Sequence, residues 1–218
     1  MKNQLNTHVR LMAIAVFFVL LTGLSSLFLM NSMRHEQDLM NQSQQKLLTA
    51  TLAVEDAHTQ FKIQVQEWKN LLLRGNNPED YTKYYGSFNH QTDQVQMLLN
   101  TEKSELDNNV LNDLNEVINQ HKTLVKTYQE TLATAKLDSL QGIVATDKSV
   151  RGIDRTLDNL FPQLTKNITQ NLEKKIRQDN ESHAKSYEKH TLLIISFVSI
   201  SIIFIILSFW IGAKKNLK

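Results

Sequence analysis

The sequence predicts an all-α protein in which two transmembrane helices flank an up-down-up-down four-helix bundle whose first and fourth helices are long. Apolar runs at residues 11–30 and 192–213 bracket a polar segment. That segment carries apolar residues at three- and four-residue spacing, which is typical of helices that bury one face. The whole chain has only two prolines and six glycines, too few for the many turns of a sheet protein.

Both apolar runs are long enough to span a membrane. Neither contains a charged side chain, and at about 1.5 Å per residue each covers a hydrocarbon core of about 30 Å. All 22 Asp and Glu lie between the runs, whereas the tails 1–10 and 214–218 carry only basic charges. The positive-inside rule therefore predicts cytoplasmic tails and places residues 31–191 on the other side of the bilayer. A cleaved signal peptide is the alternative for the first run, but the run is long and no A-x-A-like site follows it.

Charge and cysteine content exclude several classes of function. The segment between the spans is slightly acidic, which disfavours binding to nucleic acid. The chain has no cysteine, so disulfides, thiolate nucleophiles and Cys-ligated metals are absent. The segment must therefore be stabilised by packing alone.

The first two helices of the bundle are delimited by their end signals. Apolar residues recur at steps of seven from Met33 to Trp68, which predicts a long helix that continues out of the first span. Arg74 and Gly75 are typical of a helix end. Asn77 then supplies an N-cap and Pro78 a first helical residue for a helix that extends to Leu99.

The third and fourth helices follow from similar signals. A turn at Asp107 precedes an apolar stripe that ends at Leu132. The periodicity lapses over residues 138–146 around Gly142, which predicts a break there. A fourth helix is then expected from about Val150 through Ile176 toward the second span.

The membrane-proximal part of this bundle has a weak apolar seam. Met33 and Met40 are accompanied by polar residues, and Asn180 and His183 interrupt the last helix opposite them. A second copy would supply the missing apolar surface, so we expect a dimer.

Catalytic and metal sites are not expected. The chain lacks a nucleophile elbow, a phosphate-binding glycine loop and an H-E-x-x-H motif. Its histidines are scattered singly along different predicted helices, which favours packed or solvated roles over metal ligation. We therefore predict a protein that is not an enzyme and holds no metal or cofactor.

One end of the bundle carries a candidate site for a small anionic ligand. The topology brings the end of the first helix to the level of the start of the fourth, and cations there could bridge an anion. The candidate residues are Trp68, Lys69, Arg74, Arg151 and Arg155. Core packing is the alternative role for the aromatic residues. Pairing with Asp147, Asp154 or Glu67 on solvated faces is the alternative for the arginines.

Three stretches resemble bacterial methyl-accepting chemotaxis proteins. They are Gln64–Gly75 with Asn77-Pro78, Tyr84-Tyr85, and Arg151-Gly152-Ile153-Asp154-Arg155. The resemblance covers residues 1 to about 213 and corresponds to the N-terminal sensory half of these receptors. It implies a dimeric, periplasmic four-helix-bundle ligand-binding domain in the inner membrane, whose last helix moves when ligand binds.

The sequence after the second span departs from that family. A HAMP linker and a cytoplasmic signalling domain would follow there, and only Lys214–Lys218 is found. We therefore expect a sensory module that signals through a partner, as a homodimer or as a heterodimer with full-length receptors. The alternatives are a structural or interaction coiled coil of the envelope without a small ligand, and a truncated receptor remnant.

Overall fold

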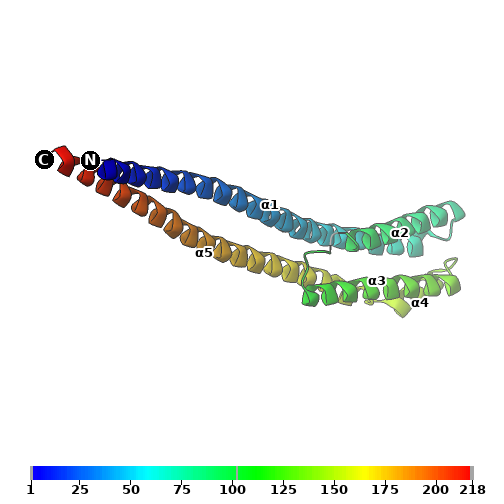
Figure 1. Ribbon diagram of the computed structural model, residues 1–218. Coiled ribbons are helices and arrows are strands. Elements are labelled where there is room, and N and C mark those ends of the chain that lie inside the picture. The colour runs from blue at the N-terminus through cyan, green and yellow to red at the C-terminus, as the bar shows by residue number, and fades with distance from the viewer. Residues whose placement is uncertain (1, 102, 217–218) are drawn as a thin grey trace. The chain divides into compact units, whose positions relative to one another are not determined.

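The structure, a computed structural model, describes residues 2–101 and 103–216. The described part contains five α-helices and no strand, so the prediction of an all-α protein is confirmed (Figure 1). The helices are α1 (Lys2–Arg74), α2 (Pro78–Leu99), α3 (Asn108–Thr134), α4 (Leu140–Val150) and α5 (Asp154–Asn216). Residues 1, 217 and 218 of the predicted tails 1–10 and 214–218 lie outside the described residues.

The chain divides into two compact units. Unit 1 comprises Met1–Asn41 and Arg177–Lys218, and unit 2 comprises Gln42–Ile176. Helices α1 and α5 contribute to both units, whereas α2, α3 and α4 belong to unit 2 alone. The continuation of the first helix out of the apolar run at residues 11–30 is confirmed.

Unit 1 contains the two apolar runs, in the two helices that are long and apolar enough to cross a membrane. Among its described side chains only Ala15 and Ser201 are buried, and Phe28 is 78% exposed. The rings of Phe18 and Phe204 stack with centroids 5.7 Å apart. An outward-facing apolar surface of this kind suits lipid, because lipid solvates it and water does not.

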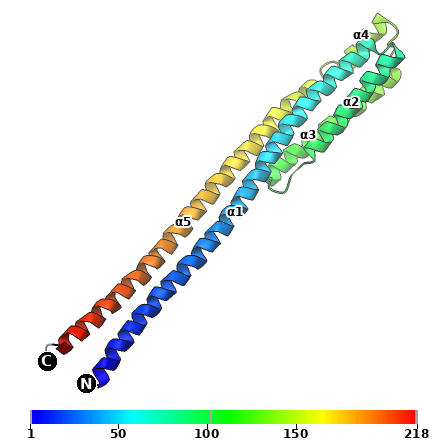
Figure 2. The same ribbon diagram turned by 90° about the horizontal axis from the view of Figure 1, so that it is seen from above.

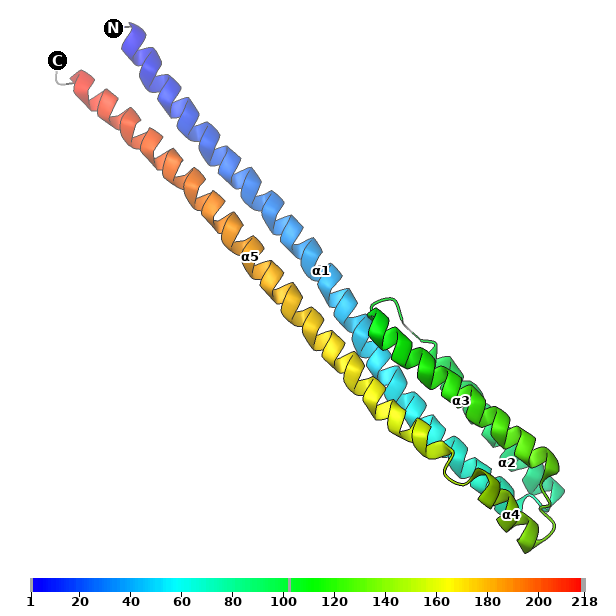
Figure 3. The same cartoon turned by 90° about the horizontal axis from the view of Figure 1, so that it is seen from below.

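Unit 2 contains the hydrophobic core. Figures 2 and 3 show α2 and α3 beside the part of α1 that belongs to this unit. Its fully buried side chains come from α1, α2, α3 and α5, and the largest are Phe61, Phe88 and Phe161. Trp68, also buried, packs against Phe88, and the ring of Phe61 lies 5.6 Å from that of Phe161. From Leu47 to Trp68 the heptad stripe predicted for the first helix therefore faces this core, whereas its Met33 and Met40 lie in unit 1 and are half-buried.

Neighbouring helices of unit 2 run antiparallel. Along α1, Gln64 contacts Thr92 of α2 and Arg74 contacts Tyr84, so the residue number rises on one helix while it falls on the other. The α3–α5 pair behaves in the same way. Asp107 accepts from Asn171, and Asp113 accepts from Asn167.

Two of the predicted helix starts are confirmed in detail. The Asn77 side chain accepts a hydrogen bond from the backbone N–H of Glu79, with Pro78 at the first helical position of α2. Asp107 caps α3 by accepting from the backbone N–H of Val110. Each cap satisfies a backbone donor that the helix itself leaves unpaired.

The break predicted over residues 138–146 is misplaced. Ser139 accepts a hydrogen bond from the N–H of Gly142 and so begins α4, which runs through most of that stretch (Figure 3). The helices are interrupted instead at residues 135–139 and again after Val150. At the second break Gly152 has φ +83°, a left-handed conformation that favours glycine. Gly142 instead allows the backbone of Lys136 to approach closely, because a Cβ at this position would lie 2.1 Å from the carbonyl oxygen of Lys136.

Candidate functional site

The interior of unit 2 contains a polar cluster that joins α1, α2 and α3. Gln64 and His121 are fully buried, each within an otherwise apolar stripe. Gln64 lies between Phe61 and Trp68 on the buried face of α1, and α2 contributes Thr92 and Gln96. We call these four residues, Gln64, Thr92, Gln96 and His121, the polar core cluster.

The donor and the acceptor can be assigned for each hydrogen bond of the polar core cluster. The Thr92 hydroxyl donates to the carbonyl oxygen of Phe88 at 3.0 Å, so its oxygen accepts from Nε2 of Gln64 at 2.5 Å. Oε1 of Gln64 then faces Nε2 of His121 at 2.9 Å, and that ring nitrogen must carry the proton. Nδ1 of His121 accepts from Nε2 of Gln96 at 2.5 Å. The cluster therefore fixes a neutral imidazole in one tautomer.

Burial lowers the pKa of His121 to about 4, because the apolar surroundings disfavour the charged ring. The ring of Phe61 meets it edge-on at 6.2 Å. Because the hydrogen bonds join side chains of α1, α2 and α3, the polar core cluster can fix the register of these three helices.

The predicted site residues lie near the α1–α2 turn and the α4–α5 turn. Trp68 is 3% exposed and stacks on Tyr128, with ring centroids 4.3 Å apart. Its environment is core packing, which was the alternative to a ligand contact. Lys69 is exposed.

The arginines of the predicted site have separate neighbours. Arg74 donates to the hydroxyl of Tyr84 at 2.6 Å. Arg151 donates from two nitrogens to Oδ2 of Asp147, at 2.6 and 3.1 Å, as the surface-pair alternative expected. Arg155 is exposed and lies over Gly152, and the described residues give it no ion pair. Anion binding by these residues stays a prediction.

Tyr128 connects the two sides of the predicted site. It stacks on Trp68, and its pKa is raised first by burial and then by the nearby carboxylates of Asp154 and Asp147. The structure therefore brings Trp68 and the α4–α5 turn to one level of unit 2. It does not direct the guanidinium groups of Arg74 and Arg151 to a common point.

A charged cluster lies at the other end of unit 2, on the loop between α2 and α3. Glu105 accepts from Ser43 Oγ at 3.0 Å and pairs with Lys46 at 3.6 Å, both on α1. It also pairs with Lys175 of α5. Hydrogen bonds from Lys175 and Ser43 lower the pKa of this carboxyl group below its usual value. We call these four residues, Ser43, Lys46, Glu105 and Lys175, the Glu105 clasp.

A further polar pair joins α1 to α5. Nε2 of His58 lies 2.6 Å from Oδ1 of Asp158, and the His58 ring stacks on Phe161 at 4.9 Å. Within the described residues, no three His, Cys, Asp or Glu side chains gather in a way that could hold a metal ion. The predicted lack of a metal stays a prediction.

Unit 2 has a small groove of about 210 Å³ between α3 and α5, lined by Asp107, Asp113, Asn167, Asn171 and Lys174 among others. The two aspartates already accept from Asn171 and Asn167. The Oδ1 atom of Asn171 is buried without a hydrogen-bond partner among the described residues. None of the five predicted site residues lines this groove.

The sequence did contain a signal for the polar core cluster. Gln64 and His121 occupy positions where the apolar periodicity of their helices demands a buried side chain. Two polar residues at buried positions imply a hydrogen-bonded pair. Glu105 gave no such signal, because its partners lie far away in the sequence.

Comparisons with known proteins relate the chain to a chemotaxis receptor. Over 173 residues it is 31% identical to methyl-accepting chemotaxis protein CtpH of Pseudomonas aeruginosa, an alignment that covers 77% of this chain. The chain spans 29% of the length of that relative. No family model matches the sequence. No solved structure matches it either.

Proposed function

We propose that the protein is a sensory module of chemoreceptor type. In this proposal unit 2 is a periplasmic four-helix-bundle domain, and the apolar runs of unit 1 anchor it in the bacterial inner membrane with both tails in the cytoplasm. The observation that carries the proposal is the similarity to a methyl-accepting chemotaxis protein over 77% of the chain. Two helices able to span a membrane and the antiparallel packing of unit 2 support it.

The proposed ligand is a small anion bound at the end of unit 2 that contains Trp68, Lys69, Arg74, Arg151 and Arg155. Arg151 and Arg155 are exposed, and they flank the turn at Gly152. Their guanidinium groups suit carboxylate or phosphate-like ligands, which they can contact with two parallel hydrogen bonds. Binding would have to favour one packing of the helices over another to transmit a signal.

The proposed partner is a second copy of the chain or a full-length receptor. Leu48 and Leu52 of α1 are each about half exposed, and they lie one turn apart on one face of unit 2. In unit 1, a cavity of about 430 Å³ lined by Met33, Met40 and His183 among others remains between the helices. Added helices would cover such surfaces.

Ligand-dependent stabilisation of the full chain in lipid nanodiscs tests this function. The probes are a panel of amino acids, organic acids and inorganic anions. A true ligand at a hundredfold its dissociation constant adds about 2.7 kcal/mol to stability. We expect one class of anion to raise the melting temperature, and Arg151→Gln or Arg155→Gln to abolish the rise. Lys166→Gln, at an exposed position of α5, is the matched control and should retain it.

If no compound of the panel stabilises the chain, the sensor proposal fails and the envelope interaction protein takes its place. If a compound stabilises the wild type and both arginine variants equally, the sensor remains and the proposed site is wrong. The first outcome tests the proposed function, and the second tests the residues that we assign to the site.

A further inference from the structure

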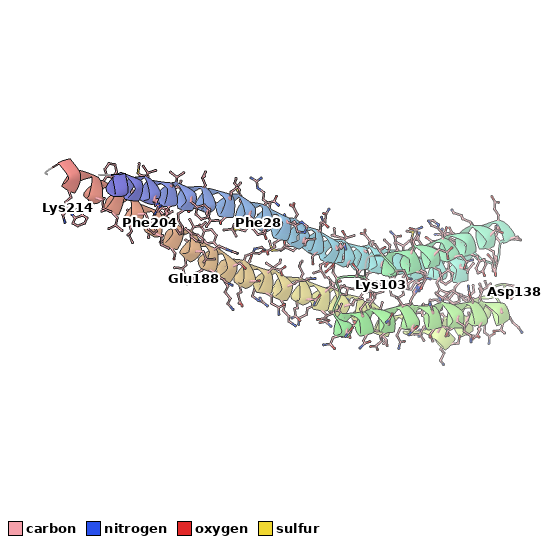
Figure 4. All side chains as sticks on the ribbon, in the orientation of Figure 1. Phe28, Lys103, Asp138, Glu188, Phe204 and Lys214 are labelled. Carbon is pink, nitrogen blue, oxygen red and sulfur yellow. The ribbon has the colours of Figure 1, made fainter. Side chains whose placement is uncertain are left out.

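The loop between α2 and α3 places one carboxylate against both of the helices that continue beyond unit 2. Figure 4 marks this loop at Lys103, two residues before Glu105. Of the five helices described, only α1 and α5 extend from unit 2 into unit 1. Glu105 therefore contacts the two helices that link unit 2 to the rest of the chain.

The carboxylate of Glu105 has partners on both helices at once. Oε2 accepts from Ser43 Oγ of α1 at 3.0 Å and also pairs with the Lys175 ammonium of α5. Oε1 lies 3.6 Å from Nζ of Lys46 on α1. One carboxylate therefore contacts both helices, and an axial shift of either helix would break one set of its contacts.

These contacts lie at the boundary of unit 2. The unit begins at Gln42 on α1 and ends at Ile176 on α5, so Ser43 and Lys175 are the next residues inward on each helix. Further into the unit, α1 and α5 meet through the rings of Phe61 and Phe161 and through His58 with Asp158. Apolar ring contacts lack direction, whereas the hydrogen bonds of a carboxylate require specific distances. Glu105 and Asp158 are therefore the carboxylates that set the axial level of α5, Glu105 at the boundary of the unit and Asp158 further inside.

The Glu105 clasp can also be released. The side chains of Lys46 and Lys175 are 44% and 33% exposed, and that of Glu105 is 23% exposed. Water can replace each partner, so breaking the contacts leaves no charge buried without solvation. Partly exposed ion pairs of this kind contribute modestly to stability, which suits a contact that opens and closes.

We propose that the Glu105 clasp is a releasable lock that holds α5 in one axial position against α1, and that its loss frees α5 to shift along α1. The lock is a property of the fold and does not depend on unit 2 being a sensor. If unit 2 does bind a ligand, the clasp sets how much binding energy a displacement of α5 requires.

Distance measurements between spin labels test the lock directly. The chain has no cysteine, so two introduced cysteines are uniquely labelled. Thr49 of α1 and Gln170 of α5 are exposed positions within unit 2 and outside the clasp. The labelled full chain in nanodiscs is compared with the same chain carrying Glu105→Gln, or Lys175→Met as an independent second variant. The matched controls are Glu116→Gln, at an exposed position of α3, and Lys174→Met, the exposed neighbour of Lys175.

We expect one main distance in the wild type and in both controls. The two clasp variants should gain a second distance, its population rising roughly fivefold over the wild type, as expected for the loss of a partly exposed ion pair. An unchanged distance distribution in both clasp variants overturns the lock. Lower melting temperatures of these variants would not rescue the proposal. A purely structural contact would lower stability without displacing α5.

Discussion

Unit 2 has one hydrophobic core, to which α1, α2, α3 and α5 all contribute, and two kinds of polar contact. The polar core cluster joins α1, α2 and α3, and partly exposed contacts join α5 to the rest of the unit. The polar core cluster is neutral and fully buried, and its hydrogen bonds run in one direction. The Glu105 clasp is charged, the His58–Asp158 pair joins an imidazole to a carboxylate, and both are partly exposed. Buried polar groups are costly to leave unpaired, whereas exposed charges return to water when separated. The polar contacts among the first three helices should therefore resist separation most, and the polar contacts of α5 should exchange with water more readily.

The largest expected effect comes from acidification of the polar core cluster. The pKa of His121 is about 4 in the folded protein, against 6.5 for an unperturbed histidine. Between these values the unfolded chain binds a proton that the folded chain does not. The full stability is present above pH 6.5, and up to about 3 kcal/mol is lost as the pH falls to 4. Urea unfolding can be followed by Trp68 fluorescence in a Trp210→Phe background.

The matched variant for this pH dependence is His121→Gln, which keeps a hydrogen-bonding side chain and does not titrate. Its stability should change less between pH 6.5 and 4 than that of the wild type. His90→Gln, at an exposed position of α2, should retain the wild-type dependence. Equal slopes for all three proteins would rule out His121 as the titrating group.

An intermediate effect is expected when the polar core cluster loses one partner at constant pH. Gln64→Leu keeps the approximate volume and leaves the Nε2–H of His121 without an acceptor. We expect a loss of about 1–3 kcal/mol, because the buried donor cannot reach water. Gln66→Leu changes an exposed glutamine of the same helix and should stay within about 0.5 kcal/mol of the wild type. A Gln64→Leu protein as stable as that control would contradict the role of the cluster.

The smallest effects belong to the charged contacts. Glu105→Gln should cost about 1 kcal/mol at low salt, and less in 1 M NaCl because the ions screen its lysine partners. The Lys126–Glu130 pair is more solvated, with side chains 75% and 67% exposed, so its loss should give the smallest change in stability. Glu130→Gln should change stability by less than about 0.5 kcal/mol. If the loss of stability caused by Glu105→Gln does not change with salt, the clasp behaves as a buried contact and not as an exposed one.

The pH dependence of the clasp has the same sign as that of the cluster. The pKa of Glu105 is lowered in the folded state, so its contribution is present above the pKa of the unfolded carboxyl group. It is lost as the pH falls through the folded value. Both regions therefore weaken in acid, and the variants above separate their contributions.

Local chemistry explains which parts of the fold could be predicted from the sequence. The starts of α2 and α3 depend on Asn77 and Asp107, whose side chains bond backbone groups two or three residues away. The break before α5 was misplaced because Gly142 and Gly152 are equally permissive residues. Only the folded backbone shows that Gly152 adopts the positive φ.

The candidate site was less predictable because its contacts connect distant residues. Trp68 was assigned to a ligand site, and its burial against Tyr128 depends on how α1 and α3 pack. The Glu105 clasp joins residues whose sequence separations reach 62 and 70 positions. Periodicity predicts which face of a helix is buried, but it does not predict which polar side chains meet between helices.

The fixed tautomer of His121 places a proton on Nε2 whose exchange with water can be measured. The Nε2 proton is shielded from solvent by three helices and bonded to Gln64, so it should exchange with water only when these helices separate. In an NMR spectrum it would give a slowly exchanging resonance, distinct from those of the exposed imidazoles. Its exchange rate would measure how often the interior of unit 2 opens, without a label or a substitution.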